Sequence, residues 1–113
     1  MHEYSLVEAL LARVEREAQR RNAVAVRRLS LRIGDLAGVE RELFETAYAT
    51  CREGTACAEA ELVVRPVRVR WACSACGKDM ASGDVLTCPD CRSPARLVEG
   101  DEIVLDRIEM EVA

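Results

Sequence analysis

The first twenty residues carry apolar side chains at a helical spacing. Four of them recur at every fourth position: Leu6, Leu10, Val14 and Ala18. Residues three and four apart share one face of an α-helix, so this spacing indicates an amphipathic helix. Ser5 followed by Glu8 fits a capping box, in which each side chain accepts a hydrogen bond from a backbone N–H at the helix start. We therefore predict a helix over residues 5–20, preceded by a short free arm of residues 1–3.

The segments that follow alternate between apolar and polar residues, which is typical of half-buried strands. The alternation covers residues 24–33 and returns in residues 62–71 and 103–112. Pro66 interrupts the second stretch and indicates a bend or a sheet edge. Residues 40–52 carry acids in their first turn and apolar residues on one face, which favours a second helix.

Four of the six cysteines form two CxxC pairs. They are Cys73 with Cys76 and Cys88 with Cys91, and eleven residues separate the pairs. Each pair folds as a tight knuckle that directs two thiolates at one ion, and two knuckles complete a tetrahedral site. Four thiolates without an open position are typical of structural zinc. We expect zinc to supply the folding energy of this small module, and Trp71 with Val85 or Leu86 to cover the site.

The order helix, strand, helix, strand, cysteine module, strand predicts an α+β fold. Its parts are a small mixed sheet with two helices and an inserted zinc-ribbon-like module that contains the two CxxC knuckles. We assign residues 1–70 to an α/β domain and residues 71–95 to the zinc-binding module. Residues 96–113 are expected to return to the first domain as one or more strands.

Composition narrows the class of protein. The chain has 113 residues, of which 50% are hydrophobic, so one small folded domain with its module is expected. A net charge of −4 argues against a nucleic-acid binder held by phosphate contacts. No apolar run approaches the roughly 20 residues of a membrane span and no signal-peptide core is present, so we expect a cytoplasmic protein without membrane contact. In a reducing compartment, cysteines point to metal ligands before disulfides.

The only histidine of the chain is residue 2. If Met1 keeps a free amine, that amine, the amide nitrogen of His2 and the Nδ1 of His2 close adjacent small chelate rings around one metal ion. The amide nitrogen or the carboxylate of Glu3 supplies a fourth position. Nitrogen donors in a planar array suit Ni(II) or Cu(II), whereas Zn(II) prefers a tetrahedron. Taken alone, a histidine at position 2 also fits an isolated surface side chain.

Several segments occur together in a specific order along the whole chain. They are Met1-His2-Glu3-Tyr4-Ser5-Leu6 at the start, Ile33-Gly34-Asp35-Leu36-Ala37-Gly38-Val39-Glu40 in the middle, the four CxxC cysteines, and Ile108-Glu109 in the closing strand. In this combination the chain resembles the hydrogenase nickel-incorporation family, HypA. The resemblance implies a nickel metallochaperone that carries Ni(II) as cargo and zinc as a structural ion.

The resemblance also assigns roles to residues by position. Met1 and His2 would be nickel ligands, with Glu3 contributing its amide or modulating the site, and the four CxxC cysteines would bind zinc. Glu40 matches an acidic position that could approach the nickel, and we do not expect it to be a ligand. Arg92 stands where the family commonly has Gly, which puts backbone donation to the second knuckle in question. The implied partners are a GTPase of the HypB type and the large-subunit precursor of [NiFe]-hydrogenase, with urease a further recipient in some organisms.

Two other classes of protein stay open. A zinc-ribbon module that binds nucleic acid or another protein would use Arg65, Arg68 and Arg70, although their alternation with apolar residues is also what a half-solvated strand shows. Thiol redox chemistry would need the CxxC pairs to be free of metal. The sequence contains no Ser-His-Asp arrangement and no GxxxxGK[ST] phosphate loop. We therefore expect no enzyme activity and assign no catalytic residue.

Overall fold

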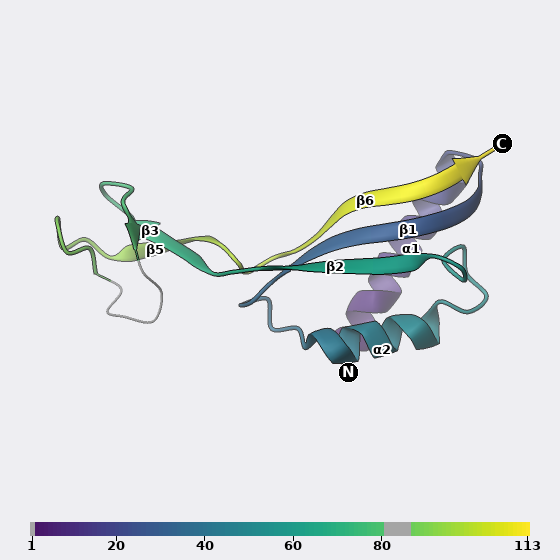
Figure 1. Cartoon of the computed structure of the whole chain (residues 1–113), viewed down its shortest axis with the longest axis horizontal. Helices are drawn as coiled ribbons and strands as arrows, with labels where there is room; N and C mark the ends of the chain where they lie inside the picture. Colours follow the sequence, from purple (N-terminus) through teal and green to yellow (C-terminus); the bar gives the residue numbers. More distant parts are fainter. Residues whose placement is uncertain (1, 81–86) are drawn as a thin grey trace.

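The computed structural model describes residues 2–80 and 87–113 of the chain. Its elements are α1 (His2–Arg20), β1 (Ala23–Gly34), α2 (Arg41–Cys51), β2 (Glu61–Val67), β3 (Arg70–Cys73), β4 (Asp79–Met80), β5 (Ala95–Glu99) and β6 (Ile103–Val112). The molecule is elongated, with principal extents of 57 × 28 × 16 Å. Figure 1 shows the helices and the longer strands at one end and a smaller sheet at the other. The predicted α+β fold with its inserted module is confirmed.

The larger sheet has the order β2-β1-β6. β1 pairs in parallel with β2 and antiparallel with β6, so the sheet is mixed as predicted. Leu29 of β1 lies opposite Leu62 on one side and Ile108 on the other. Because successive side chains of a strand point to opposite faces, Leu29 is buried beneath the helices, whereas Arg28 and Arg32 lie on the open face. There they pair with carboxylates of the neighbouring strands.

α1 turns a slightly different face to the sheet from the predicted one. Its buried apolar residues are Val7, Leu11, Val14 and Ala18. The steps between them alternate between four and three, which follows the 3.6-residue turn more closely than a stripe at every fourth position. Leu6 and Leu10 are therefore only half-buried, at the side of the helix. α2 contributes Phe44, Ala47 and Tyr48 to the same core.

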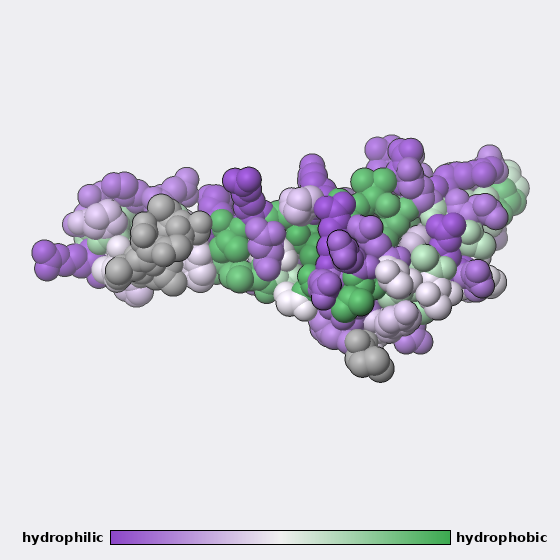
Figure 2. Space-filling model, turned by 60° about the horizontal axis from the view of Figure 1, so that its bottom comes forward, coloured by the Kyte–Doolittle hydropathy of each residue, from purple (hydrophilic) through white to green (hydrophobic). Residues whose placement is uncertain are grey.

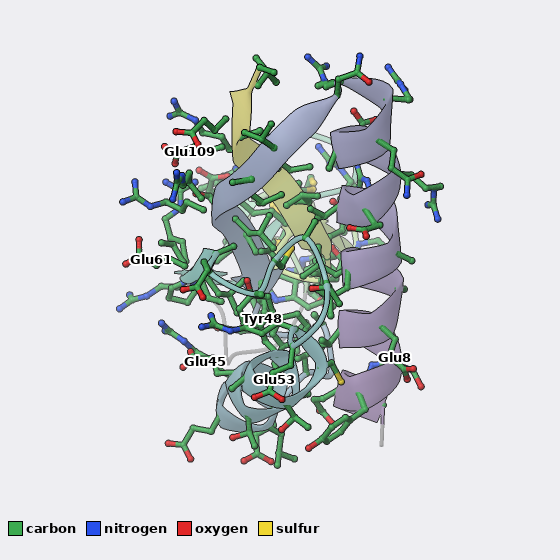
Figure 3. The ribbon with its side chains drawn as sticks, turned by 90° about the vertical axis from the view of Figure 1, so that its right-hand side faces the viewer. Glu8, Glu45, Tyr48, Glu53, Glu61 and Glu109 are labelled. Atoms are coloured by element: carbon green, nitrogen blue, oxygen red, sulfur yellow. The ribbon has the colours of Figure 1, made fainter. Side chains whose placement is uncertain are left out.

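Tyr48 ties α2 to the segment that leads into β2. Its hydroxyl donates a hydrogen bond to the carbonyl of Ala60 at 2.7 Å. The guanidinium of Arg52 donates to the same carbonyl at 2.9 Å and lies 5.5 Å from the centroid of the tyrosine ring. Figure 3 shows Tyr48 between α2 and the strands, while Glu8 points outward from the far side of α1. These contacts hold α2 against the segment that leads into the larger sheet.

The start of α1 differs from the prediction. The helix begins at His2, so His2 and Glu3 are helical and the free arm proposed for residues 1–3 is wrong for both of them. Met1 lies outside the described residues. The Ser5–Glu8 capping box is also wrong, because Ser5 is the fourth residue of the helix and not its N-cap. A tertiary contact competes with that local signal: the carboxylate of Glu3 is buried against the backbone of Glu40.

The smaller sheet has the order β4-β3-β5 and carries the cysteine module. Residues 96–113 were expected to return to the first domain, but β5 at their start pairs antiparallel with β3 of the smaller sheet. The two sheets meet at a narrow neck where three backbone segments cross. The N–H of Asp35 donates to the carbonyl of Val67 at 2.9 Å, and the N–H of Leu36 donates to the carbonyl of Gly100 at 2.7 Å. A Cβ atom on Gly34 would lie 2.2 Å from the carbonyl carbon of Gly100, so this crossing requires glycine.

The face shown in Figure 2 is mostly hydrophilic, with apolar patches between the hydrophilic residues. Val24, Leu36 and Val63 are among the exposed apolar side chains. In the part of the chain that the structure describes, no helix is long and apolar enough to cross a membrane.

Candidate metal centres

The two CxxC pairs converge in the smaller sheet. The Sγ atoms of four cysteines all lie within 4.8 Å of one another: Cys73, Cys76, Cys88 and Cys91. The Sγ atoms of Cys73 and Cys91 are 3.1 Å apart, and those of Cys76 and Cys88 are 3.8 Å apart. Zn–S bonds of about 2.3 Å in a tetrahedron place sulfur atoms about 3.8 Å apart. The four sulfurs therefore fit one zinc ion with only a small adjustment.

The two knuckles have the same backbone geometry. In the first, the N–H of Gly77 donates to the carbonyl of Cys73 at 3.1 Å. In the second, the N–H of Arg92 donates to the carbonyl of Cys88 at 2.9 Å. Gly77 has a φ of 77° and Arg92 a φ of 60°, so both residues adopt the left-handed conformation that favours glycine. Arg92 thus takes the place of a glycine at the cost of some backbone strain.

Backbone N–H groups surround the first sulfur of each knuckle. Donation from the N–H of Cys76, supported by the sulfur of Cys91, lowers the pKa of Cys73 to about 6. The N–H groups of Cys91 and Asp90 lower the pKa of Cys88 in the same way. Backbone donation to the second knuckle, which Arg92 put in question, is therefore present at Cys88. Both cysteines favour the thiolate, which is the form that binds a metal ion.

The sulfur contacts favour a metal site shared by both knuckles over a dithiol redox site within one of them. A redox CxxC motif places the two sulfurs of one motif next to each other. Here the sulfur of Cys73 contacts that of Cys91, and the sulfur of Cys76 contacts that of Cys88, so both of these contacts join the two knuckles. An ion pair between Lys78 and Asp90 at 2.7 Å joins them once more at the surface.

The sequence predicted that Trp71 and either Val85 or Leu86 cover the cysteine site, and the structure describes only Trp71 of these. Trp71 is half-buried in β3, where it lies opposite Leu97 and Met80. Val85 and Leu86 lie outside the described residues, so their predicted packing over the cysteines stays a prediction.

The remaining cysteines are not part of the cluster. Cys51 is half-buried at the end of α2, and Cys57 is buried in the following turn. Burial, followed by the nearby charge of Glu15, raises the pKa of Cys57 to about 11. A thiol that stays protonated at neutral pH is a poor nucleophile. Cys57 therefore acts as a small core residue beside Tyr48.

The second candidate centre lies at the start of α1. His2 is exposed in the first turn, and Glu3 is only 8% exposed. The carboxylate of Glu3 accepts a hydrogen bond from the N–H of Glu40 at 3.0 Å, and its pKa is lowered by this bond and by the N–H of Glu3 itself. Glu40 thus contributes its backbone at this place. Its importance for Glu3 could not be found from the sequence, because 37 residues separate the two.

The whole chain matches known relatives. The model of the family described as "Hydrogenase/urease nickel incorporation, metallochaperone, hypA" matches residues 1–110. The hydrogenase maturation factor HypA of Aquifex aeolicus is 36% identical over 114 residues, covering 99% of each chain. The hydrogenase maturation factor HypA of Shewanella halifaxensis is 37% identical over 115 residues, covering 100% of each chain.

Solved structures agree with this match. The solution structure of the Ni metallochaperone HypA from Helicobacter pylori superimposes with a TM-score of 0.75 at 29% identity, covering 98% of each chain. A second solution structure of a HypA protein reaches a TM-score of 0.81 at 30% identity, covering 100% of this chain and 98% of that one. Sequence, fold and the four-cysteine metal site point the same way: this chain belongs to the HypA family of nickel-incorporation metallochaperones.

Proposed function

We propose that this chain binds Ni(II) through Met1, His2 and Glu3 and delivers the ion for the maturation of a [NiFe]-hydrogenase. Family membership over residues 1–110 is the observation that carries the proposal. The only histidine of the chain, at position 2, supplies the side chain that such a site needs. A metallochaperone is an accessory protein without a reaction of its own, which agrees with the lack of a catalytic arrangement in the sequence.

The start of α1 supports nitrogen ligation. The first four N–H groups of a helix have no acceptor within the helix. Because α1 begins at His2, the amide nitrogens of His2 and Glu3 can bond to nickel without breaking an intrahelical hydrogen bond. The carboxylate of Glu3 already accepts the N–H of Glu40, so we assign the fourth position to the amide of Glu3 and not to its carboxylate. The resulting planar set of nitrogen donors suits Ni(II).

The same geometry explains how nickel would leave. A partner can approach an ion held by the first residues of a helix from the outside and exchange its ligands one at a time. Protonation of the amine and of the amides releases the ion, and α1 keeps its own hydrogen bonds throughout. The proposed partners are a GTPase of the HypB type, which would supply nucleotide hydrolysis, and the large-subunit precursor that receives the metal.

The zinc ion that Cys73, Cys76, Cys88 and Cys91 would hold supplies a structural crosslink. Four sulfur donors in a tetrahedral array select zinc over the planar coordination that suits nickel. A nucleic-acid function for this module is not favoured, because Arg70 pairs with Asp79 at 3.2 Å and with Glu99 at 3.4 Å. Its charge is thus already balanced within the smaller sheet.

A nickel titration of zinc-loaded, tag-free protein tests the proposal. We expect one Ni(II) per chain for the native protein and loss of this binding in His2→Ala. A matched control combines His2→Ala with Gln19→His, which returns one exposed histidine to α1 away from the terminus. This control should stay deficient. Unchanged nickel binding in His2→Ala, with zinc retained, would contradict the proposed site.

A further inference from the structure

The four cysteines of the metal centre differ in their exposure to solvent. The first cysteine of each knuckle is buried, because Cys73 and Cys88 are each only 1% exposed. The second cysteine of each knuckle is exposed, Cys76 in the first knuckle and Cys91 in the second. The cluster therefore has an inner pair of cysteines inside the module and an outer pair at its surface, where a dissolved reactant can reach them.

The sulfur contacts across the cluster join an inner cysteine to an outer one. The Sγ atom of Cys73 lies 3.1 Å from that of Cys91, and the Sγ atom of Cys88 lies 3.8 Å from that of Cys76. Both contacts run from one knuckle to the other. They are nested along the chain, since Cys76 and Cys88 lie between Cys73 and Cys91 in the sequence.

Backbone hydrogen bonds hold the two knuckles next to each other. The N–H of Ser74, directly after Cys73, donates to the carbonyl of Pro94 at 3.0 Å. The N–H of Cys88 donates to the carbonyl of Ser93 at 2.9 Å. Two neighbouring residues thus hold both knuckles, and β5 begins directly after them and pairs with β3. These hydrogen bonds join backbone atoms alone, so they bring sulfurs of different knuckles together without the help of a metal ion.

We propose that Cys76 and Cys91 are sites of reversible oxidation by a peroxide, and that Cys88 and Cys73 then close disulfides between the two knuckles. The fully oxidised module contains the crossed pairs Cys73–Cys91 and Cys76–Cys88. Cysteines that sense oxidants are exposed thiolates next to a second cysteine that resolves the oxidised one. A thiol that coordinates a metal ion is deprotonated, so both outer cysteines of the zinc-loaded protein are thiolates. Each of them has an inner sulfur of the other knuckle in contact.

The chemistry takes two steps with hydrogen peroxide. The outer thiolate attacks the peroxide: an S–O bond forms, the O–O bond breaks and hydroxide leaves, which gives a sulfenic acid. The inner thiolate of the other knuckle attacks this sulfur: an S–S bond forms, the S–O bond breaks and a second hydroxide leaves. The two sulfurs lose two electrons in total, the peroxide gains them, and two protons from solvent convert the hydroxides to water. Each disulfide removes two thiolates from the metal site.

The crossed disulfides join the same two knuckles that a shared metal ion joins. β3 and β5 therefore keep their pairing after the metal ion is lost. A disulfide within each knuckle would instead leave the two knuckles without a crosslink. Reduction by a dithiol returns the four thiolates to the same place, so the oxidised module can be loaded with zinc again without folding anew.

Peptide mapping of the native, zinc-loaded protein tests the pairing. After treatment with hydrogen peroxide, the remaining thiols are blocked with N-ethylmaleimide and the chain is cut with trypsin. Trypsin cuts after Arg70, Lys78 and Arg92, so one peptide carries the first knuckle and another carries the second. Crossed disulfides link these two peptides, whereas a disulfide within a knuckle leaves them separate. We expect the linked peptides to form as zinc is released to a chromogenic chelator.

Two variants separate the crossed pairs. Cys91→Ser leaves Cys76 with its partner Cys88, and Cys76→Ser leaves Cys73 with its partner Cys91. Each variant should give linked peptides with one disulfide, and fragmentation should place the bond between the named partners. Cys51→Ser is the matched control, because this cysteine lies outside the cluster, and it should give the same linked peptides as the native protein.

Hydrogen exchange supplies a readout of the fold. In the oxidised, zinc-free protein, residues 70–73 and 95–99 should stay protected, whereas zinc removal from the reduced protein should expose them. Dithiothreitol followed by zinc should restore the native peptide map. None of these readouts depends on nickel, so the test is independent of the proposed nickel function.

Several results would overturn the proposal. They are disulfides confined to single knuckles, a bond between the two inner cysteines, sulfinic or sulfonic acids without linked peptides, and retention of zinc with four free thiols in excess peroxide. Loss of protection in the oxidised protein equal to that in the reduced, zinc-free protein would also contradict it.

Discussion

Glu3 and Glu40 join the starts of the two helices. The carboxylate of Glu3, in the first turn of α1, accepts a hydrogen bond from the N–H of Glu40 at 3.0 Å. Glu40 is the N-cap residue of α2, and its own side chain makes no capping hydrogen bond. The negative charge of Glu3 therefore lies at the positive end of α2, where it is favourable. This contact fixes the segment that carries His2 against the rest of the fold.

Replacement of Glu3 by glutamine should lower the melting temperature at neutral pH. The pKa of Glu3 is lowered in the folded state, first by the N–H of Glu40, from the ordinary value of 4.5. Its contribution to stability is thus complete above that value and is lost as the pH falls through the folded pKa. Thermal melts over a pH series should show the native protein and Glu3→Gln converging in acid. Glu8→Gln, an exposed change on the same helix, should match the native protein at every pH.

Replacement of Arg92 by glycine should stabilise the zinc-loaded protein by about 1 kcal/mol. A non-glycine residue in the left-handed region costs about 1–2 kcal/mol, and the greater freedom of glycine in the unfolded chain offsets part of the gain. Urea unfolding measures the change. Gly77→Ala, at the equivalent place in the first knuckle, should be destabilising. A loss of stability in Arg92→Gly would show that its side chain contributes more than its backbone strain costs.

A methyl group at the neck should separate the two sheets. Gly34→Ala places a Cβ 2.2 Å from the carbonyl carbon of Gly100, and backbone must move to relieve it. We expect a loss of about 3 kcal/mol or more in the free energy of unfolding. Gly38→Ala is the control, because its Cβ would meet nothing within 4 Å and only the φ of 73° is unfavourable. Equal losses in the two variants would contradict the close packing of the neck.

Removal of zinc should unfold the smaller sheet and leave the larger one intact. The smaller sheet has short strands, whereas β1 and β6 pair along most of their length around an apolar core. Metal binding supplies the folding energy of small modules of this kind. After chelation, hydrogen exchange should speed up in residues 70–73 and 95–99 and stay slow in residues 25–33. A uniform loss of protection would show that the two parts fold as one unit.

The features predicted best from the sequence are those that follow from the spacing of residue types along the chain. Two CxxC pairs predict one tetrahedral site because the sulfur geometry leaves little choice, and all four cysteines are indeed within 4.8 Å of one another. The long alternation of β1 and β6 likewise predicts paired strands with one buried face. Both patterns lie within short stretches of the chain, so they can be recognised without knowledge of tertiary contacts.

Features that depend on tertiary contacts could not be predicted. Ser5 and Glu8 form a plausible capping box, yet the helix begins at His2 because Glu3 finds its partner in Glu40. Residues 96–99 were assigned to the first domain because the five residues of β5 show little alternation, and their place in the smaller sheet depends on pairing with β3. The left-handed backbone of Arg92 is imposed by the second knuckle, and the residue type gives no sign of it.

The most direct test of the nickel proposal is a titration of the native protein beside a version with one extra residue before Met1. If the α-amine of Met1 is a ligand, the extension moves it away and one-to-one nickel binding should be lost, while zinc content and the circular dichroism spectrum stay the same. Proteolytic removal of the extra residue should restore binding. Equal nickel binding by the native and the extended chain would contradict a site built on the terminal amine.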